Sequence, residues 1–277
     1  MSSARLAPLV VLAIASLIAA GDDPARTTRA QAMRNLAEAV NVQIRGVGPR
    51  VELVKEPVYR WDDPARSFSD GSVWVYGNAG RPAALLTLSL NKTANAGFEW
   101  LHEFTALTDA RFVATSPDGW LWAPGVSGMT FQPIPNAPPP AGDEAKRARQ
   151  LTEQARRFKA FEFFDPAGAG RVQRYELRLL TKPVHRYKDS ARGILDGGVF
   201  LIAYERNPEI ALVVEAVADG KTPPRWSYGL GRSAGAELHV TLDDRDVTPW
   251  ARDEVHNGPN RPYHVFGVPI TDQTIAR

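Results

Sequence analysis

The sequence predicts an α+β protein, predominantly antiparallel β, made of two tandem-duplicated helix-plus-β-meander units with a pseudo-twofold relation. Three observations support this prediction. The stretch PVYRWDDPARSFSDGSVWVY, residues 57–76, recurs without a gap as PVHRYKDSARGILDGGVFLI, residues 183–202. In both halves, short alternating segments are separated by Gly, Pro, Asn or Asp, as in a series of antiparallel strands. A segment with helical periodicity precedes each series.

The repeat has a constant offset of 126 residues. Between Leu53 and Val75, 10 of 23 positions hold the same residue as the position 126 further on, whereas unrelated segments of this length share about one or two. The same offset pairs Trp100 with Trp226. A period this long indicates two domains or half-domains rather than a solenoid.

Residues 1–20 have the pattern of a secretory signal peptide. Arg5 supplies the positive start, LAPLVVLAIASLIAA supplies the apolar core, and small residues precede Gly21. About 15 apolar residues are fewer than the roughly 20 that span a bilayer. We therefore expect cleavage near Gly21, no transmembrane span in the mature chain, and a place in the periplasm or cell envelope; a retained anchor is the alternative.

Unit 1 is predicted over residues 21–132. Apolar residues at three- and four-residue steps predict a helix over Arg26–Ile44. Alternation of leucine with Thr87 and Ser89 predicts a strand with one buried and one wetter face. The expected strands are Val51–Val54, Val58–Trp61, Ser72–Tyr76, Ala83–Leu90, Phe98–Phe104, Arg111–Thr115 and 120–122.

A proline-rich linker over residues 133–142 separates unit 1 from unit 2, which spans residues 143–277. In unit 2 a helix is expected over Asp143–Phe161, with acidic residues at its start and basic residues at its end. The tail from Val247 has no counterpart in unit 1. The expected strands are Tyr175–Leu180, Val184–Tyr187, Gly198–Ala203, Glu209–Ala216, Trp226–Leu230 and Glu237–Leu242.

Recurring Asp-Gly pairs precede the aromatic strands of both units. Asp70-Gly71 and Asp196-Gly197 are expected to form tight turns that need a residue with positive φ, and Gly119 is expected in another such turn.

The composition excludes several kinds of site. A formal charge of +2 with interspersed acidic and basic residues has no nucleic-acid footprint. The absence of cysteine excludes disulfides and thiolate metal sites. The histidines have no zinc-helix spacing, and we expect no cofactor. The histidines are His102, His185, His239, His256 and His264.

Two motifs resemble catalytic or metal-binding sequences. Residues 231–235, GRSAG, match the nucleophile elbow of serine hydrolases around Ser233, but the segment after it alternates like a strand where the elbow needs a helix. We therefore interpret GRSAG as a hairpin loop. Residues 243–246, DDRD, lack the glycine and glutamate of a calcium loop and are interpreted as a turn.

One polar set occurs in both units. We expect its charges to pair across the loop between two strands and to support the fold; the alternative is that the two sets line equivalent pockets. The set comprises Arg60, Asp63, Arg66, Asp70, Arg186, Asp189, Arg192 and Asp196.

Seven tryptophans are many for this chain length. Trp61, Trp74 and Trp100 each meet an aromatic residue at the offset of 126, which favours packing in the core. Trp120, Trp122 and Trp250 have no such partner and are the candidate ligand-contact aromatics, since exposed rings can stack on sugars.

The stretch ELRLLTKPVHRYKDSARGILDGGVFLIAY, with PRWSYGL after it, resembles a family of uncharacterised exported tandem-repeat proteins of planctomycete-type bacteria. The resemblance covers roughly Val51 to Val247. It implies export and the same order of helix, meander, proline-rich linker and second meander. It brings no catalytic residues and no assigned activity.

The function expected from these features is non-catalytic binding of a partner or cell-envelope polymer, in the groove where the two units meet. A structural scaffold of the envelope is one alternative, and a serine hydrolase that uses GRSAG is another.

Overall fold

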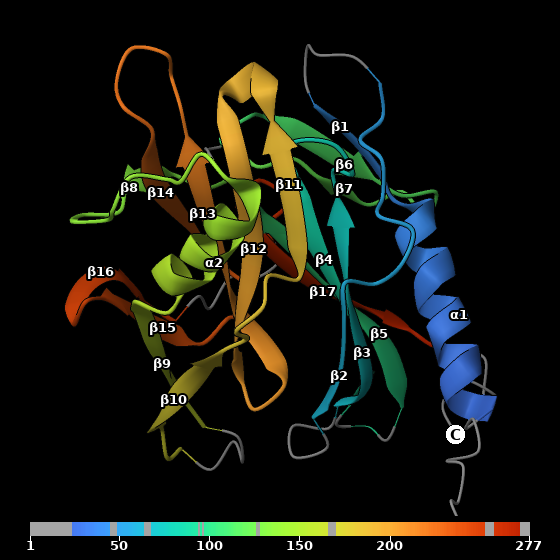
Figure 1. Ribbon diagram of the computed structural model, residues 1–277. Helices are drawn as coiled ribbons and strands as arrows, with labels where there is room; N and C mark the ends of the chain where they lie inside the picture. Colours follow the sequence, from blue (N-terminus) through green and yellow to red (C-terminus); the bar gives the residue numbers. More distant parts are fainter. Residues whose placement is uncertain are drawn as a thin grey trace, which may run out of the picture.

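The computed structural model describes residues 24–44, 49–63, 68–93, 95, 97–125, 128–165, 170–252 and 258–271. This part of the chain is mostly antiparallel strand, with two α-helices and three sheets (Figure 1). The predicted class is therefore confirmed at the level of an α+β, mainly antiparallel protein. The predicted signal peptide, residues 1–20, lies outside the described residues.

The first meander, strands β2 to β5, forms most of a five-stranded sheet. The strand order is β17-β5-β4-β3-β2. Helix α1 packs on one face, against β3 and β4. The elements are α1 (Pro24–Ala39), β2 (Tyr59–Asp63), β3 (Phe68–Tyr76), β4 (Ala84–Lys92), β5 (Phe98–Ala106) and β17 (Tyr263–Pro269).

The second meander, strands β11 to β14, belongs to a nine-stranded sheet. Its order is β16-β15-β9-β10-β12-β13-β14-β8, with β11 paired to β12. The sheet curls as a half-barrel, and α2 packs inside it. The elements are β8 (Phe131–Pro133), α2 (Glu144–Ala155), β9 (Phe158–Phe164), β10 (Gln173–Leu179), β11 (His185–Asp189), the 3₁₀ turn Ser190–Arg192, β12 (Ile194–Tyr204), β13 (Asn207–Val217), β14 (Arg225–Arg232), β15 (Glu237–Leu242) and β16 (Arg245–Trp250).

A small three-stranded sheet completes the first half. It contains β1 (Asn41–Ile44), β6 (Phe112–Thr115) and β7 (Leu121–Trp122), in the order β1-β6-β7.

The two meanders pair their strands in the same register. Paired residues in the first meander recur in the second with both numbers raised by 126, including the irregularity after Phe68 and after Ile194. Representative pairs are Tyr59 with Val73 and His185 with Val199, Trp74 with Leu86 and Phe200 with Leu212, and Leu90 with Trp100 and Ala216 with Trp226.

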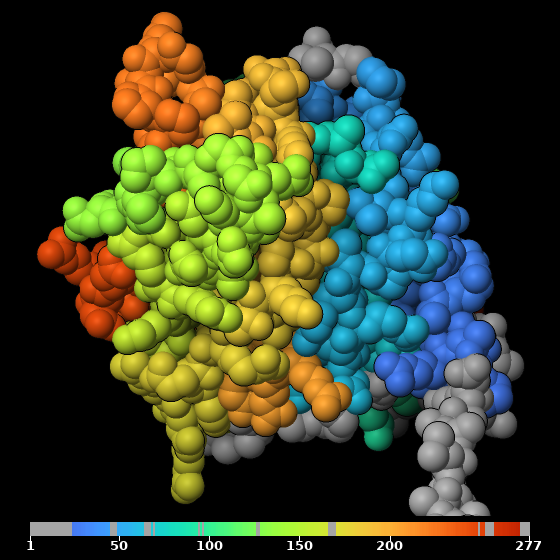
Figure 2. Space-filling model, viewed as in Figure 1, coloured from blue at the N-terminus to red at the C-terminus, as the bar shows by residue number. Residues whose placement is uncertain are grey.

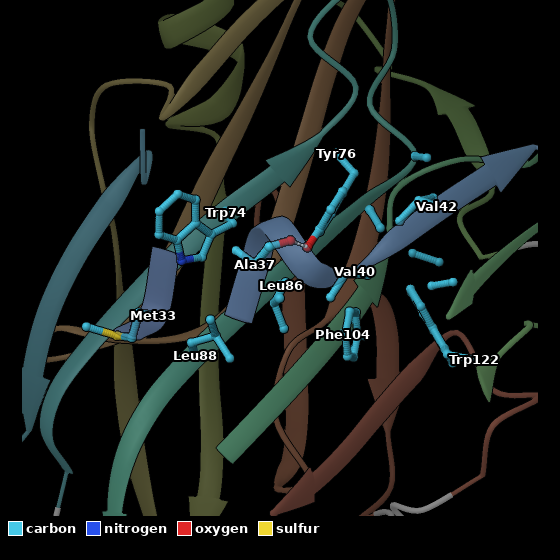
Figure 3. Packing of buried hydrophobic residues seen from close by; sticks show 14 of the residues in the cluster. Met33, Ala37, Val40, Val42, Trp74, Tyr76, Leu86, Leu88, Phe104 and Trp122 are labelled. Carbon is cyan, nitrogen blue, oxygen red and sulfur yellow. Dashed lines mark hydrogen bonds between the residues drawn. The ribbon is translucent and has the colours of Figure 1, made fainter. Parts of the chain in front are cut away.

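The core has three parts that define the layers. One cluster lies between α1 and the first meander, where Tyr76 donates a hydrogen bond to the carbonyl oxygen of Ala37 at 2.8 Å (Figure 3). A second surrounds α2 inside the curled sheet. The third lies between the facing meanders and includes Val73 and Val199. The layers therefore run α1, sheet, sheet, α2, and the halves are in close contact (Figure 2).

Two strands cross between the halves. β8 follows the first meander in sequence but pairs with β14, and β17 comes at the end of the chain but pairs with β5. Each meander is therefore extended by a strand from the other half, and the two halves are interlocked.

Both helices are shorter than the sequence predicts. Helix α1 ends at Ala39 and β1 follows it, and α2 ends at Ala155 before β9. Val40 and Val42 are buried apolar residues two positions apart, as in a strand, but they also fit the helical period of the residues before them. The sequence pattern alone therefore does not show where α1 ends and β1 begins. The start of α2 was located correctly: Asp143 caps it by accepting from the backbone N–H of Lys146. Val51–Val54 contains one isolated β-bridge, between Leu53 and Tyr76, rather than a strand.

The recurring Asp-Gly pairs are not turns, which corrects the prediction. Gly71 and Gly197 lie inside β3 and β12. A Cβ atom would come within 2.4 Å of the Trp61 ring at Gly71 and within 2.6 Å of the Tyr187 ring at Gly197. An aromatic ring of the neighbouring strand lies against the backbone of each glycine. Glycine is therefore needed at these positions because a side chain would collide with the ring, and not because of a positive φ. The turn at Gly119 is confirmed, with φ of 86°.

Candidate functional site

A cavity of about 550 Å³ opens where the ends of the two meanders meet the crossing segments. Its volume lies in the range of small-molecule sites. The wall is built from β5, β8, β14, β16 and the residues that lead into β8 and β17. The lining residues are Thr105, Ala106, Gly128, Thr130, Gln132, Tyr228, Leu230, Gly231, Arg232, Val247, Thr248, Trp250, Arg261, Pro262 and Tyr263.

The segment that precedes β8 and the segment that precedes β17 hydrogen-bond to each other beside this wall. The backbone N–H of Ala123 donates to Pro259 O at 2.6 Å, and that of Gly125 donates to Asn260 O at 2.8 Å. The backbone N–H of Ala106 in β5 donates to Pro262 O at 2.9 Å. The last of these bonds joins two residues of the cavity wall.

The wall combines aromatic rings with positive charge. Among the described lining residues the charged ones are Arg232 and Arg261, and the aromatic ones are Tyr228, Trp250 and Tyr263. The Arg232 guanidinium donates to the carbonyl oxygens of Ala234, Ala236 and Ala251. These three bonds hold the Arg232 side chain in one position.

The three candidate aromatics have different environments. Trp250 lines the cavity and is half-buried. Trp120 is also half-buried, but it packs on Phe104, with ring centroids 5.1 Å apart, and does not line the cavity.

Trp122 does not meet the expectation of a surface ring. Its side chain is 0% exposed, and its indole N–H donates to Arg261 O at 2.7 Å. It packs between Phe104 and Phe112 in the first core cluster (Figure 3). A fully buried ring has no face for a ligand, so the absence of an aromatic partner at the 126-residue offset was a poor guide to exposure.

Ser233 lies in a strand–loop–strand connection and not in a strand–turn–helix elbow. The GRSAG segment covers the end of β14 and the loop that leads to β15. Within the described residues, the Ser233 hydroxyl hydrogen-bonds to Thr105 Oγ1 at 2.8 Å, and no histidine or carboxylate is within hydrogen-bonding reach of it. Gly231 also has a packing reason, because a Cβ there would lie 2.8 Å from the Thr105 methyl group.

The DDRD segment forms the predicted turn. Asp243 and Asp244 connect β15 to β16 with φ of 50° and 62°. Positive φ at both central residues is the geometry of a tight two-residue hairpin. Their carboxylates pair with Arg157 and Lys159. In the described part of the chain, no group of three or more His, Asp or Glu side chains could hold a metal ion.

The recurrent polar set pairs within each half. Arg60 binds both oxygens of Asp70 at 2.8 and 3.0 Å. Arg186 binds both oxygens of Asp196 at 2.9 and 2.8 Å. These aspartates lie in strands β3 and β12 and not in a loop, so the pairs join adjacent strands.

The remaining members of the polar set occupy less regular positions. Arg192 pairs with Asp189 at 2.7 Å in the second half. Asp63 is buried at the end of β2. Arg66 lies outside the described residues.

A second arginine, not expected from the sequence, lies close to each of these aspartates. Arg29 of α1 lies 3.3 Å from Asp70, and Arg147 of α2 lies 3.7 Å from Asp196. Each buried aspartate therefore ties its helix to its sheet. The two helix arginines are 118 residues apart and not 126, so an alignment at the single offset could not reveal them.

A buried ion pair joins the two halves and was also missed. Arg81, in the loop between β3 and β4, donates to both carboxylate oxygens of Glu215 in β13 at 2.8 and 2.6 Å. Tyr187 donates to the same carboxylate at 2.6 Å. Glu215 is 0% exposed and Arg81 is 9% exposed. The Arg81 guanidinium also stacks over the Phe131 ring at 3.8 Å.

Glu103 stands behind the cavity wall. It accepts a hydrogen bond from Tyr263 at 2.7 Å. Burial raises the pKa of Glu103 to about 7, against the opposite effect of this hydrogen bond. Burial, together with the Glu103 charge, raises the pKa of Tyr263 well above its ordinary value. Glu103 therefore changes charge near neutral pH directly behind a residue that lines the cavity.

Replacing Glu103 with glutamine is expected to stabilise the protein at high pH. Between pH 4.5 and about 7 the unfolded chain releases the Glu103 proton while the folded chain keeps it, so the free energy of unfolding falls as pH rises. We expect the variant to be more stable than the wild type by about 2 kcal/mol at pH 8, a value reduced because Glu103 is only partly buried, and equally stable at pH 4. Urea denaturation at pH 4, 6 and 8 measures this.

The comparison of the Glu103→Gln variant with the wild type also cancels the opposite pH dependence of stability that His102 causes. Burial lowers the pKa of His102 to about 4, so its contribution to stability is lost as pH falls from 6.5 to 4. This contribution is the same in both proteins and cancels. A stability difference that does not grow between pH 4 and 8 would show that Glu103 ionises normally in the folded protein.

Comparisons with known proteins find no family model, no curated protein and no solved structure that matches the chain. Within the described residues, neither helix has the length and apolar character needed to cross a membrane.

Proposed function

We propose that this is an exported, non-catalytic protein that binds a polymer of the cell envelope in the cavity between the two meanders. The observation that carries the proposal is this cavity of about 550 Å³, where the half-buried Trp250 ring forms part of the wall. Aromatic side chains supply large, rigid surfaces with both apolar and polar parts, which suit stacking on sugar rings. The secretory pattern of residues 1–20 supports export.

The open junction favours binding over a purely structural role. A scaffold protein without a ligand has no need of a cavity between its halves, and the third core cluster shows that the meanders pack closely elsewhere. The environment of Ser233, which hydrogen-bonds to Thr105, favours binding over serine hydrolysis.

The two halves are inferred to descend from one duplicated unit, with a pseudo-twofold relation. The matching strand registers at an offset of 126 support this. So does the reciprocal exchange of β8 and β17. The binding cavity then lies at the junction that duplication created.

Binding to envelope polymers should depend on Trp250. We expect the protein to sediment with at least one polymer in a panel of peptidoglycan and envelope polysaccharides, and Trp250→Ala to weaken that binding about tenfold because a ring that contacts the polymer is lost. The matched control is Trp120→Ala, which removes another half-buried indole outside the cavity and should leave binding unchanged. Thermal unfolding confirms that both variants are folded.

Two results would contradict this proposal. One is equal binding by the Trp250→Ala variant and the wild type, which would place the site elsewhere. The other is failure of the wild type to bind any polymer in the panel, which would favour a scaffold role.

A further inference from the structure

We infer that Trp61, Ser89 and Asn207 form a buried polar site that binds internal water between the two meanders. These three residues are not part of the cavity wall, and the inference is independent of the proposed function. It is carried by polar atoms of the three side chains that are buried without a protein partner, and by the place of these residues in the fold.

The site is the counterpart of the buried ion pair that joins the two halves. Ser89 and Glu215 each lie opposite the glycine of a recurring Asp-Gly pair, so the strand registers agree at the two sites. In the ion-pair site the long side chains reach and satisfy one another, whereas serine and asparagine are shorter than glutamate and arginine. The counterparts at the offset of 126 are Trp61 for Tyr187, Ser89 for Glu215 and Asn207 for Arg81.

The Trp61 ring brings its N–H next to Ser89. The indole lies against the backbone of Gly71, with Nε1 2.7 Å from the position that a Cβ atom of Gly71 would occupy. Ser89 is directly opposite Gly71 in the neighbouring strand β4. Residues opposite each other in antiparallel strands have Cβ atoms about 4.5 to 5.5 Å apart. One water molecule can therefore bond to both the indole N–H and the Ser89 hydroxyl.

Asn207 approaches the same region from the second meander. It begins β13, and the residue before it, Arg206, pairs with Asp62 of β2 at 2.6 Å, one position from Trp61. The Asn207 amide nitrogen donates to Glu209 at 3.0 Å. This bond fixes the orientation of the amide, because only its NH₂ group can donate to a carboxylate. The amide oxygen is then left to accept from another group.

The three side chains each have a buried polar atom without a hydrogen-bond partner in the described part of the chain. The atoms are Trp61 Nε1, Ser89 Oγ and Asn207 Oδ1, and the residues are 3%, 0% and 8% exposed. A buried polar atom without a partner destabilises the folded state, and native proteins nearly always pair such atoms with protein groups or ordered water. Three such atoms at the counterpart of a satisfied polar site indicate a bound polar molecule.

Water is the ligand whose chemistry fits all three groups. The ligand must accept a hydrogen bond from the indole N–H and donate one to the amide oxygen, while the Ser89 hydroxyl can do either. A metal cation cannot accept from the indole, and a simple anion cannot donate to the amide oxygen. An internal water molecule typically makes about three hydrogen bonds to buried polar groups, which matches the groups available here.

A high-resolution crystal structure of the full chain tests the site directly. We expect electron density for at least one ordered water molecule at hydrogen-bonding distance from Trp61 Nε1 and from Ser89 Oγ or Asn207 Oδ1. A map without water beside Trp61 Nε1 would overturn the inference, whether the indole N–H then proves to be unpaired or bonded to a protein group.

Removing the Ser89 hydroxyl gives a second test in solution, because a hydrated site and a dry site predict different signs. If Ser89 bonds to internal water, Ser89→Ala loses that bond, and we expect the melting temperature to fall by about 2 to 4 °C. If the site is dry, the variant loses only an unpaired buried hydroxyl, and the melting temperature stays the same or rises. Differential scanning calorimetry measures the shift.

Ser190→Ala is the matched control for this substitution. Ser190 is exposed, so its hydroxyl is already in bulk water, and the same change there should shift the melting temperature by about 1 °C or less. A fall for Ser89→Ala no larger than the shift of the control would overturn the inference. If Ser89→Ala does not fold, the crystal structure of the wild type still decides the question.

Discussion

Replacing Arg81 with methionine is expected to lower the free energy of unfolding by about 3 to 5 kcal/mol, because it leaves the Glu215 carboxylate buried between the two sheets without its cationic partner. Arg81 makes two hydrogen bonds to this carboxylate, and Glu215 is fully buried. Tyr187 can still donate to Glu215, but a neutral hydroxyl does not replace the charge. Urea denaturation at pH 7 measures the change.

Two controls show whether burial causes the loss. The double variant Arg81→Met with Glu215→Leu should recover most of the stability, since replacing a whole buried ion pair with apolar groups is often nearly neutral. Arg206→Met breaks the exposed pair with Asp62 and should cost less than about 1 kcal/mol. A loss below 1 kcal/mol for Arg81→Met would mean that Glu215 reaches water or is protonated, and that the halves are held mainly by apolar contacts.

Replacing Trp122 with alanine is expected to cost about 3 to 5 kcal/mol of stability, the usual range for truncating a fully buried aromatic side chain. The ring packs between Phe104 and Phe112, and its N–H donates to the carbonyl oxygen of Arg261, just before β17. The change therefore removes core packing and leaves a backbone acceptor without its indole donor. Guanidinium denaturation measures the stability.

The half-buried Trp250 supplies the contrast. Trp250→Ala should cost clearly less stability than Trp122→Ala, because part of the ring already faces the cavity. If Trp122→Ala left stability unchanged and abolished polymer binding, Trp122 would be a ligand contact after all and the described core would be incorrect.

The strands β4 and β13 were predicted to within two residues, because each is an apolar segment bounded by turn residues. The expected wetter face of β4 was wrong: Thr87 is 4% and Ser89 0% exposed, because α1 covers one face of the sheet and the second meander covers the other. The strands that cross between the halves were not predictable. β8 has three residues, and β17 pairs with a strand about 160 positions earlier, so neither has a local partner or turn to mark it.

The candidate site was predictable only in part. Trp250 was among the expected ligand contacts, and it lines the cavity. Trp122 was expected on the same grounds, yet it fills a core position, because an aromatic residue without a counterpart can satisfy a packing need of one half alone. Arg232 and Arg261 were not singled out, since nothing in the sequence shows that a strand end and a crossing segment, far apart in the chain, meet at one cavity.

A crystal structure of the protein with a bound oligosaccharide, chosen as the tightest ligand from the binding measurements, tests the central claim most directly. We predict electron density for the sugar in the cavity between the two meanders, with one ring against Trp250. An empty cavity, with the sugar bound on another surface of the protein, would contradict the account.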